Sequence, residues 1–222
     1  MRIILALAAL ACASQARAAE STRMAFPAAG IAALAIEAPA GNIAVEAGSG
    51  EIAVEVTRFD PERCTLTMAP KDGTLLLKVE TKSRTGIFRR GCEAGFKVTA
   101  PAALPVKVET GAGSILFDGL SGRVQANTGA GSIRGTLTSS KADVSTGAGS
   151  IDLSWKKSPA AGLIKADTGA GSIRFAFPAG TIIEANLSTG IGSLTNQLGD
   201  TKGAPLRVTA SSGVGSVTIV KS

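Results

Sequence analysis

Histidine is absent from this 222-residue chain, so the residues that could do chemistry are acids, lysines, serines and cysteines. Without histidine, neither a Ser-His-Asp nor a Cys-His arrangement can form. Paired carboxylates remain to be considered, because glycoside hydrolases act through two of them. The candidates next to the repeated sequences of the chain are Glu109, Asp143, Asp152 and Asp167.

These four acids differ in their position relative to a six-residue repeat, Thr-Gly-Ala-Gly-Ser-Ile, which we call the corner. Glu109 and Asp167 directly precede a corner, Asp143 lies three residues before one, and Asp152 directly follows one. We therefore expect no acidic cluster on a single groove, and no enzymatic activity. The alternative is a carbohydrate-active lyase or hydrolase on a β-helix, which two or three acids and a basic residue in one exposed groove would favour.

Two short motifs match known sites but lack their context. Ser154 to Lys157 fits the Ser-x-x-Lys pattern of penicillin-recognising enzymes, but the accompanying Ser-Asp-Asn and Lys-Thr-Gly motifs are absent. We expect a lysine-edged loop there, with Trp155 pointing inward. A dinucleotide fingerprint would need a third glycine after each Gly-Ala-Gly-Ser, where the chain has Leu116, Arg134, Asp152 and Arg174. No cofactor is expected.

Cys64 and Cys92 are the only cysteines beyond the N-terminal segment. In an oxidising compartment two cysteines most simply form one disulfide, which we predict here. Two thiolates in a chain without histidine cannot complete a tetrahedral zinc site, so no metal is expected.

The N-terminal segment indicates export to the periplasm or the cell surface. Met1 and Arg2 give a positive start, residues 3–11 are continuously apolar, and residues 16–18 read Ala-Arg-Ala. This order is typical of a signal peptide, predicted over residues 1–18, and the apolar run is too short to span a bilayer. Lipidation at Cys12 is the less favoured alternative, because the leucine of a lipoprotein motif usually lies one place earlier.

The charge of the chain is too small for a nucleic-acid binder. Excluding Arg2 and Arg17 lowers the formal net charge from +6 to +4, and the remaining basic residues are scattered. Their one local excess, at Arg84, Arg89 and Arg90, is best explained as a solvated loop. An anionic lipid or polymer surface is the weaker explanation.

The corner occurs in four identical copies, beginning at residues 110, 128, 146 and 168, and in two looser copies, Thr-Gly-Ile-Gly-Ser-Leu at 189 and Ser-Gly-Val-Gly-Ser-Val at 212. The offsets between successive copies are 18, 18, 22, 21 and 23 residues. Glycine tolerates the positive φ of a sharp bend, and small residues let stacked backbones approach to about 4.8 Å. The corners contain twelve of the chain's 27 glycines: Gly111, Gly113, Gly129, Gly131, Gly147, Gly149, Gly169, Gly171, Gly190, Gly192, Gly213 and Gly215.

Strands flank each corner. Apolar residues such as Val106 and Val108 alternate with polar ones before it, and a second strand starts after it, as at Ile115. Period two with one apolar face is typical of half-buried strands. The regular period predicts an all-β fold, a single-domain parallel β-solenoid (β-helix) of about 18–23 residues per coil. Turn-rich residues 154–159 and 199–205 are expected to loop out.

In-register stacking of successive coils would place Asp152 between Arg134 and Arg174, about one strand spacing from each. It would also leave the last strand, with Val217 and Ile219, as an edge of unpaired backbone groups. We expect this edge either to add a strand from a second copy or another partner, or to be covered by a loop such as residues 199–205.

The first third of the chain is less regular. Residues 41–43 (Gly-Asn-Ile) and 50–52 (Gly-Glu-Ile) resemble eroded corners followed by alternating residues. We expect degenerate coils and a disulfide-tied cap over residues 19–105, continuous with regular coils over residues 106–222. Atypical ends are needed to cover the last apolar face of such a stack.

The corners, with residues 96–101 (Phe-Lys-Val-Thr-Ala-Pro) and 104–106 (Leu-Pro-Val), resemble the bacterial putative-adhesin family of exported β-strand-repeat proteins. The resemblance covers roughly residues 35–220, and the Gly-x-Gly-Ser corner is its most specific part. It implies a β-solenoid and a cell-envelope or surface location, and it transfers no catalytic residues. We expect a non-enzymatic scaffold whose partner is an unidentified protein or an envelope polymer.

Overall fold

The computed structural model describes residues 22–82 and 91–222. The predicted signal peptide with Cys12, and the basic residues Arg84, Arg89 and Arg90, lie outside this part. Within the described residues the regular elements are all strands, which confirms the all-β prediction. Accordingly, no helix in this part of the chain is long and apolar enough to cross a membrane.

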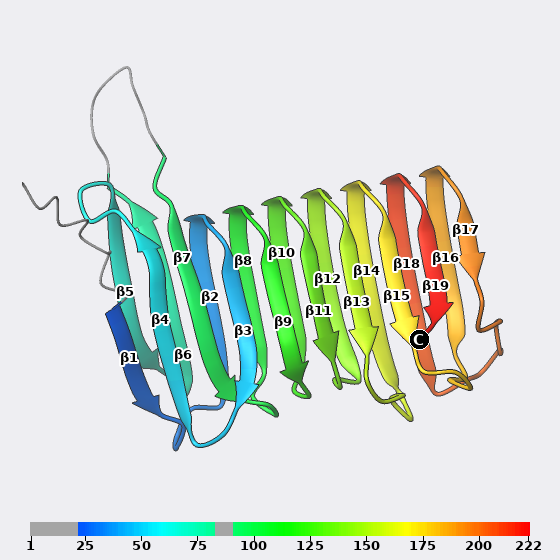
Figure 1. Ribbon diagram of the computed structural model, residues 1–222, viewed down its shortest axis with the longest axis horizontal. Coiled ribbons are helices and arrows are strands. Elements are labelled where there is room, and N and C mark those ends of the chain that lie inside the picture. The colour runs from blue at the N-terminus through cyan, green and yellow to red at the C-terminus, as the bar shows by residue number, and fades with distance from the viewer. Residues whose placement is uncertain (1–21, 83–90) are drawn as a thin grey trace, which may run out of the picture.

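The strands form two large mixed sheets that lie face to face (Figure 1). Sheet A has the order β1 (Thr22–Pro27), β4 (Glu51–Phe59), β7 (Ala94–Pro101), β3 (Ile43–Gly48), β9 (Ile115–Leu120), β11 (Ile133–Leu137), β13 (Ile151–Trp155), β15 (Ile173–Phe177), β19 (Val217–Lys221) and β17 (Leu194–Asn196). Sheet B has the order β16 (Glu184–Ile191), β18 (Leu206–Val214), β14 (Gly162–Ala170), β12 (Lys141–Ala148), β10 (Val124–Ala130), β8 (Val106–Ala112), β2 (Ala33–Ala40), β6 (Thr74–Thr81) and β5 (Cys64–Lys71).

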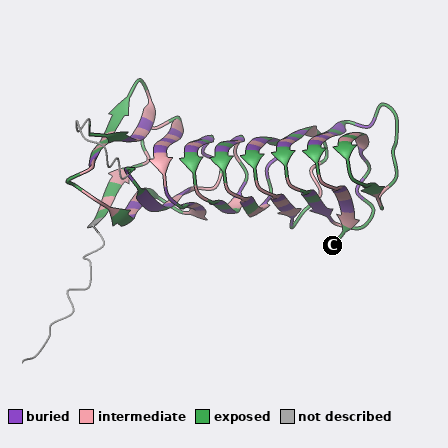
Figure 2. Cartoon of the chain, turned by 90° about the horizontal axis from the view of Figure 1, so that it is seen from above, coloured by how far each residue is buried: buried purple, intermediate pink, exposed green. Residues whose placement is uncertain are grey.

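A strand of sheet B, a corner and a strand of sheet A form what we call a two-strand unit, such as β8–β9. Neighbouring units pair in parallel and in register, so that Thr128 lies between Thr110 and Thr146. Alternate residues of both sheets point into one core, while the first glycine and the alanine of each corner, seen from above in Figure 2, are exposed. Trp155 points into that core as predicted, stacked on Phe177 with ring centroids 4.4 Å apart, although it ends strand β13 and does not lie in the expected loop.

The units do not stack in sequence order at either end of the molecule. From one end to the other the order is β6–β7, β2–β3, β8–β9, β10–β11, β12–β13, β14–β15, β18–β19 and β16–β17. The prediction that β19 forms an open edge is therefore wrong. Val217 and Ile219 are fully buried, because β19 lies between β15 and β17. The strands that end the two sheets here are β16 and β17.

The opposite end is closed by antiparallel strands, which makes the sheets mixed rather than purely parallel. β4 pairs antiparallel with both β1 and β7, and β5 pairs antiparallel with β6. Residues 50–52 were expected to form a corner, and that expectation is wrong: Gly50 lies in the turn before β4, which reverses direction within sheet A. Gly41, in contrast, occupies a corner between β2 and β3.

The predicted register around Asp152 is confirmed. Asp152 on β13 is paired with Arg134 on β11 and with Arg174 on β15. Arg174 Nη1 donates a hydrogen bond to Asp152 Oδ1 over 3.2 Å. The four corners that begin at residues 110, 128, 146 and 168 thus stack consecutively, as their sequences indicate.

Candidate functional site

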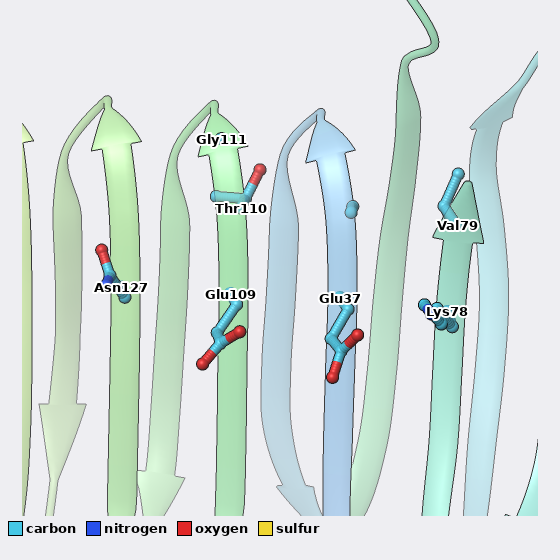
Figure 3. A pocket seen from close by; sticks show the side chains of 8 residues that line it. Glu37, Lys78, Val79, Glu109, Thr110, Gly111 and Asn127 are labelled. Atoms are coloured by element: carbon cyan, nitrogen blue, oxygen red, sulfur yellow. The ribbon is translucent and has the colours of Figure 1, made fainter. Parts of the chain in front are cut away.

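A shallow hollow on the outer face of sheet B is the candidate site. It spans β6, β2, β8 and β10 near the corners and has a volume of about 360 Å³. Figure 3 shows the side chains of Glu37 and Glu109 lying next to each other on neighbouring strands, with Asn127 one strand further on. The hollow is lined by Glu37, Ala38, Lys78, Val79, Glu109, Thr110, Gly111 and Asn127.

Strand register places these polar side chains in one row. Glu37 is paired with Lys78 on one side and with Glu109 on the other, and Glu109 is paired with Asn127. Each precedes or follows an inward-facing apolar residue, so strand alternation turns it outward. Adjacent strands lie about 4.8 Å apart, and the row therefore reads lysine, glutamate, glutamate, asparagine.

Lysines on this face pair with acids two residues further along the same strand. Lys107 Nζ lies 2.8 Å from Glu109 Oε1, and Lys78 Nζ lies 2.8 Å from Glu80 Oε1. The hydrogen bond to Glu109, and then its negative charge, raise the pKa of Lys107 above its ordinary value. Glu37 makes no ion pair with any described residue, so its carboxylate is available to a ligand.

A second hollow of about 150 Å³ continues the first across the face of sheet B. Glu109 and Asn127 line both hollows, which together extend from β6 to β12. The second is lined by Lys107, Val108, Glu109, Gln125, Ala126, Asn127, Asp143 and Ser145. The face is thus a continuous polar strip with charges of both signs.

The expectation that no groove would hold an acidic cluster is wrong. Glu37 and Glu109 share one hollow with Lys78, which is the arrangement named above as favouring an enzyme. Asp143 lies in a different row from Glu109, but it lines the second hollow together with Glu109 and Lys107. Asp167 lies in the row of Glu109, next to Ser145, whereas Asp152 lies in sheet A. No group of three or more potential metal-ligating side chains occurs within residues 22–82 and 91–222.

The arrangement suits polar recognition better than acid–base catalysis. A glycosidase general acid is held protonated by an apolar pocket, whereas the Glu109 side chain is about half exposed and contacts a lysine. Carboxylate, ammonium and amide groups at strand spacing can instead accept from and donate to a polar ligand lying across the strands.

No protein-family model matches the chain, and no curated protein does. Among solved structures, the chain is similar to a putative cell adhesion protein from Clostridium sporogenes ATCC 15579, with a TM-score of 0.53, 11% sequence identity, and coverage of 91% of this chain and 100% of that one. A putative adhesin from Bacteroides fragilis NCTC 9343 gives a TM-score of 0.48 and 15% identity, with coverage of 91% of this chain and 98% of that one. At such low identity, the likeness to the Clostridium protein concerns the fold alone.

Both glycines of each corner are required by the stacking. A Cβ on Gly129 would collide with the carbonyl oxygen of Gly111 in the neighbouring unit, and a Cβ on Gly131 would collide with that of Gly113. Gly131 also has φ of 144°, a conformation that side chains disfavour. Gly147, Gly149, Gly169, Gly171, Gly190, Gly192, Gly213 and Gly215 repeat the same two contacts.

The threonine of the corner links one unit to the next. The buried Thr146 hydroxyl donates to the carbonyl oxygen of Gly131 over 2.8 Å, and Thr168 donates likewise to Gly149 over 2.9 Å. The corner hydroxyls thus bond along the stack, with backbone carbonyls as the acceptors. These bonds satisfy carbonyl groups that would otherwise be left unpaired at a bend.

The disulfide between Cys64 and Cys92 is present, with Cα atoms 5.4 Å apart. It joins the start of β5 to the segment before β7, at the end of the stack formed by β1, β4 and β5. We call this the β1–β5 end, and the opposite one the β16–β17 end.

The sequence contains a signal for one side of the hollow, in the spacing between Glu37 and Gly41. Gly41 is the second glycine of an eroded corner, and counting back four residues places Glu37 in the column of Glu109. Lys78 carried no such signal, because the sequence between β6 and β7 contains no Gly-x-Gly-Ser.

Proposed function

We propose that this chain is an exported, non-enzymatic β-solenoid that binds an extended partner, a protein or an envelope polymer, along the outer face of sheet B. The observation that carries the proposal is the in-register row of outward polar side chains, with two hollows joined through Glu109 and Asn127. Repetition at strand spacing offers equivalent contacts along the stack, which suits a ligand that is itself repetitive or extended.

The solenoid architecture is supported by the parallel, in-register pairing of successive two-strand units from β2–β3 to β14–β15. Export is supported by the disulfide, because such bonds persist in oxidising compartments, and by the signal-peptide pattern at residues 1–18. A location in the periplasm or at the cell surface follows from the same two observations.

The proposal is tested by removing charge from one face at a time. Glu37→Gln with Glu109→Gln alters the hollow, while Asp118→Asn with Asp152→Asn makes the matched change on the outer face of sheet A. Tagged wild-type protein and both variants are used to capture material from envelope extract and from a panel of purified wall polymers. We expect the sheet B variant to lose a bound species that the sheet A variant retains. Equal capture by all three proteins would contradict the proposal.

A carbohydrate-active enzyme is the second candidate, favoured only by the shared hollow of Glu37, Glu109 and Lys78. The same proteins should be incubated with polysaccharides and the release of reducing or unsaturated ends measured. We expect no turnover. Turnover that Glu37→Gln or Glu109→Gln abolishes, with Asp152→Asn unaffected, would establish the enzyme instead.

A further inference from the structure

The β16–β17 end leaves backbone groups of both sheets without a partner among the described residues. Elsewhere in the stack, the second corner glycine donates to the next unit, as Gly171 does to the Val214 carbonyl oxygen and Gly215 to that of Ile191. Gly192, in the last unit, has no next unit to donate to. Sheet edges of this kind are templates for strand addition.

A loop covers the first part of the β16 edge and leaves the second part open. The Ala185 N–H donates to Asp200 Oδ1 over 2.8 Å, and the Thr201 N–H donates to the Ile183 carbonyl oxygen over 2.9 Å. Backbone groups alternate in direction along a strand, so those of Leu187 and Thr189 point away from β18 as those of Ala185 do. No described residue pairs with these outward groups.

The two strands at this end are also apolar and almost uncharged. Ile191 is 70% exposed and Leu194 is 49% exposed. The last residue of every other corner, which corresponds to Leu194, is buried. Glu184 is the single charged residue in β16 and β17, and it pairs with Arg207 over 3.3 Å. The outer strands of the β1–β5 end, in contrast, carry proline and basic residues: Arg23, Pro27, Pro70 and Lys71.

We propose that two copies of this chain join at their β16–β17 ends, with β16 pairing antiparallel to β16 of the second copy across a two-fold axis at Ser188. In this register Leu187 lies opposite Thr189 of the other copy, and the reverse, which forms four backbone hydrogen bonds from the open groups. No charged side chain meets one of like sign across the axis.

A second copy fits this end better than it fits the other one. Proline lacks an N–H and cannot join a ladder, so the strands of the β1–β5 end resist head-to-tail addition. The end of the stack measures roughly 25 by 20 Å. The first length is that of the eight residues of β16 at about 3.3 Å each, and the second is that of two sheets about 10 Å apart with the side chains on their outer faces. Pairing then buries about 1,000 Å² in total, the lower bound for a specific interface. A two-fold contact closes on itself and stops at the dimer.

The test places a cysteine on the proposed two-fold axis in one variant and, as a control, a cysteine one strand away in another. Ser188 is exposed on the outer face of sheet B, and Ser211 is its in-register neighbour on β18. Residues opposite each other at a non-hydrogen-bonded antiparallel position lie about 4.5 Å apart, within disulfide range. Ser188→Cys should therefore form an intermolecular disulfide under mild oxidation, and Ser211→Cys should not.

Sedimentation of the purified wild-type protein over a wide concentration range should show a reversible rise to twice the monomer mass. Ser188→Lys puts two like charges on the axis and should weaken the dimer at least about ten-fold, whereas Ser211→Lys should leave it unchanged. Thermal melts of both lysine variants at low concentration check that the monomer is intact. A wild type that stays monomeric, or equal cross-linking of both cysteine variants, overturns the proposal. In that case the open edge is left to a strand from a different protein.

Discussion

At the β1–β5 end, strands that run antiparallel cover the stack, a disulfide ties β5 to the segment before β7, and proline and basic residues occupy the outermost strands. At the β16–β17 end, the last two strands keep the parallel direction of the stack and leave Ile191 and Leu194 exposed. The units between the two ends are nearly identical. The comparison shows that the repeat itself does not terminate the stack, and that each end needs residues which depart from it.

The largest effect is expected from removing residues 206–222, which form β18 and β19. Leu206, Val208, Val217 and Ile219 are fully buried, and each contributes about 1.5–3 kcal/mol. Their sum is comparable with the 5–15 kcal/mol that stabilises a whole domain. Limited proteolysis with mass spectrometry should show cleavage throughout residues 184–205, with the β1–β5 end still protected.

Removing residues 22–27, which form β1, is the matched truncation and should release one outer strand only. A shortened chain that lacks residues 206–222 yet resists proteolysis like the wild type would contradict the position of β18–β19 between β14–β15 and β16–β17.

The disulfide should stabilise the β1–β5 end specifically. Cys64 and Cys92 are 28 residues apart, and closing such a loop contributes roughly 3–4 kcal/mol in the chain-entropy model. Cys64→Ala with Cys92→Ala should lower the free energy of unfolding by that amount, measured with urea. Hydrogen exchange should increase in β5 and β7 but not in β16. Unchanged exchange at both ends would show that the bond does not hold this end closed.

One glycine in the interior and one at the open end allow a direct comparison. Gly149 and Gly192 have φ of 150° and 149°. A Cβ on Gly149 would collide with the carbonyl oxygen of Gly131, and a Cβ on Gly192 with that of Gly215, each in the neighbouring unit of the stack. The unit of Gly149 is held from both sides, whereas that of Gly192 can move outward. We expect Gly149→Ala to cost about 3 kcal/mol and Gly192→Ala about 1 kcal/mol, by urea unfolding of dilute protein. Equal costs would mean that the open end is as constrained as the interior.

The smallest effect is expected from surface ion pairs, whichever region they occupy. Asp152 with Arg174 lies in the interior of the stack, and Arg58 with Glu93 lies near the β1–β5 end, in both cases with half-exposed side chains. Asp152→Asn and Glu93→Gln should each change the free energy of unfolding by about 0–1 kcal/mol. Added salt should remove the difference in free energy of unfolding between each variant and the wild type. A larger loss for Glu93→Gln alone would mean that electrostatics help to close that end.

Local features were predictable because they repeat. The twelve corner glycines, the inward Trp155 and the Arg134–Asp152–Arg174 register follow from a constant period and strict alternation. The disulfide followed from the presence of two cysteines beyond the predicted signal peptide. Each of these depends only on neighbours in sequence or on the adjacent, similar unit.

The order of the units could not be predicted, because the corner at residue 189 and the corner at residue 212 are about equally similar to the corner at residue 168, and either could stack next to it. Nothing in the alternation of β18 and β19 distinguishes an end position from an interior one. Strand direction has the same ambiguity, since alternation in β4 is compatible with parallel or antiparallel pairing. The hollow was missed for a related reason: Glu37 and Lys78 come from units whose corners are eroded or replaced.

Synthesis proceeds in the opposite order to the one in which the β16–β17 end must be assembled. The ribosome releases β16 and β17 before β18 and β19, yet the earlier pair has no sheet to join until the later pair is in place. The segment from residue 184 to residue 205 therefore remains unpaired, with its apolar side chains exposed, until residues 206–222 have folded. The β16–β17 unit thus completes the two sheets only after residues 206–222 have folded, and a chain that stops within residues 184–205 would leave this unit without a neighbour.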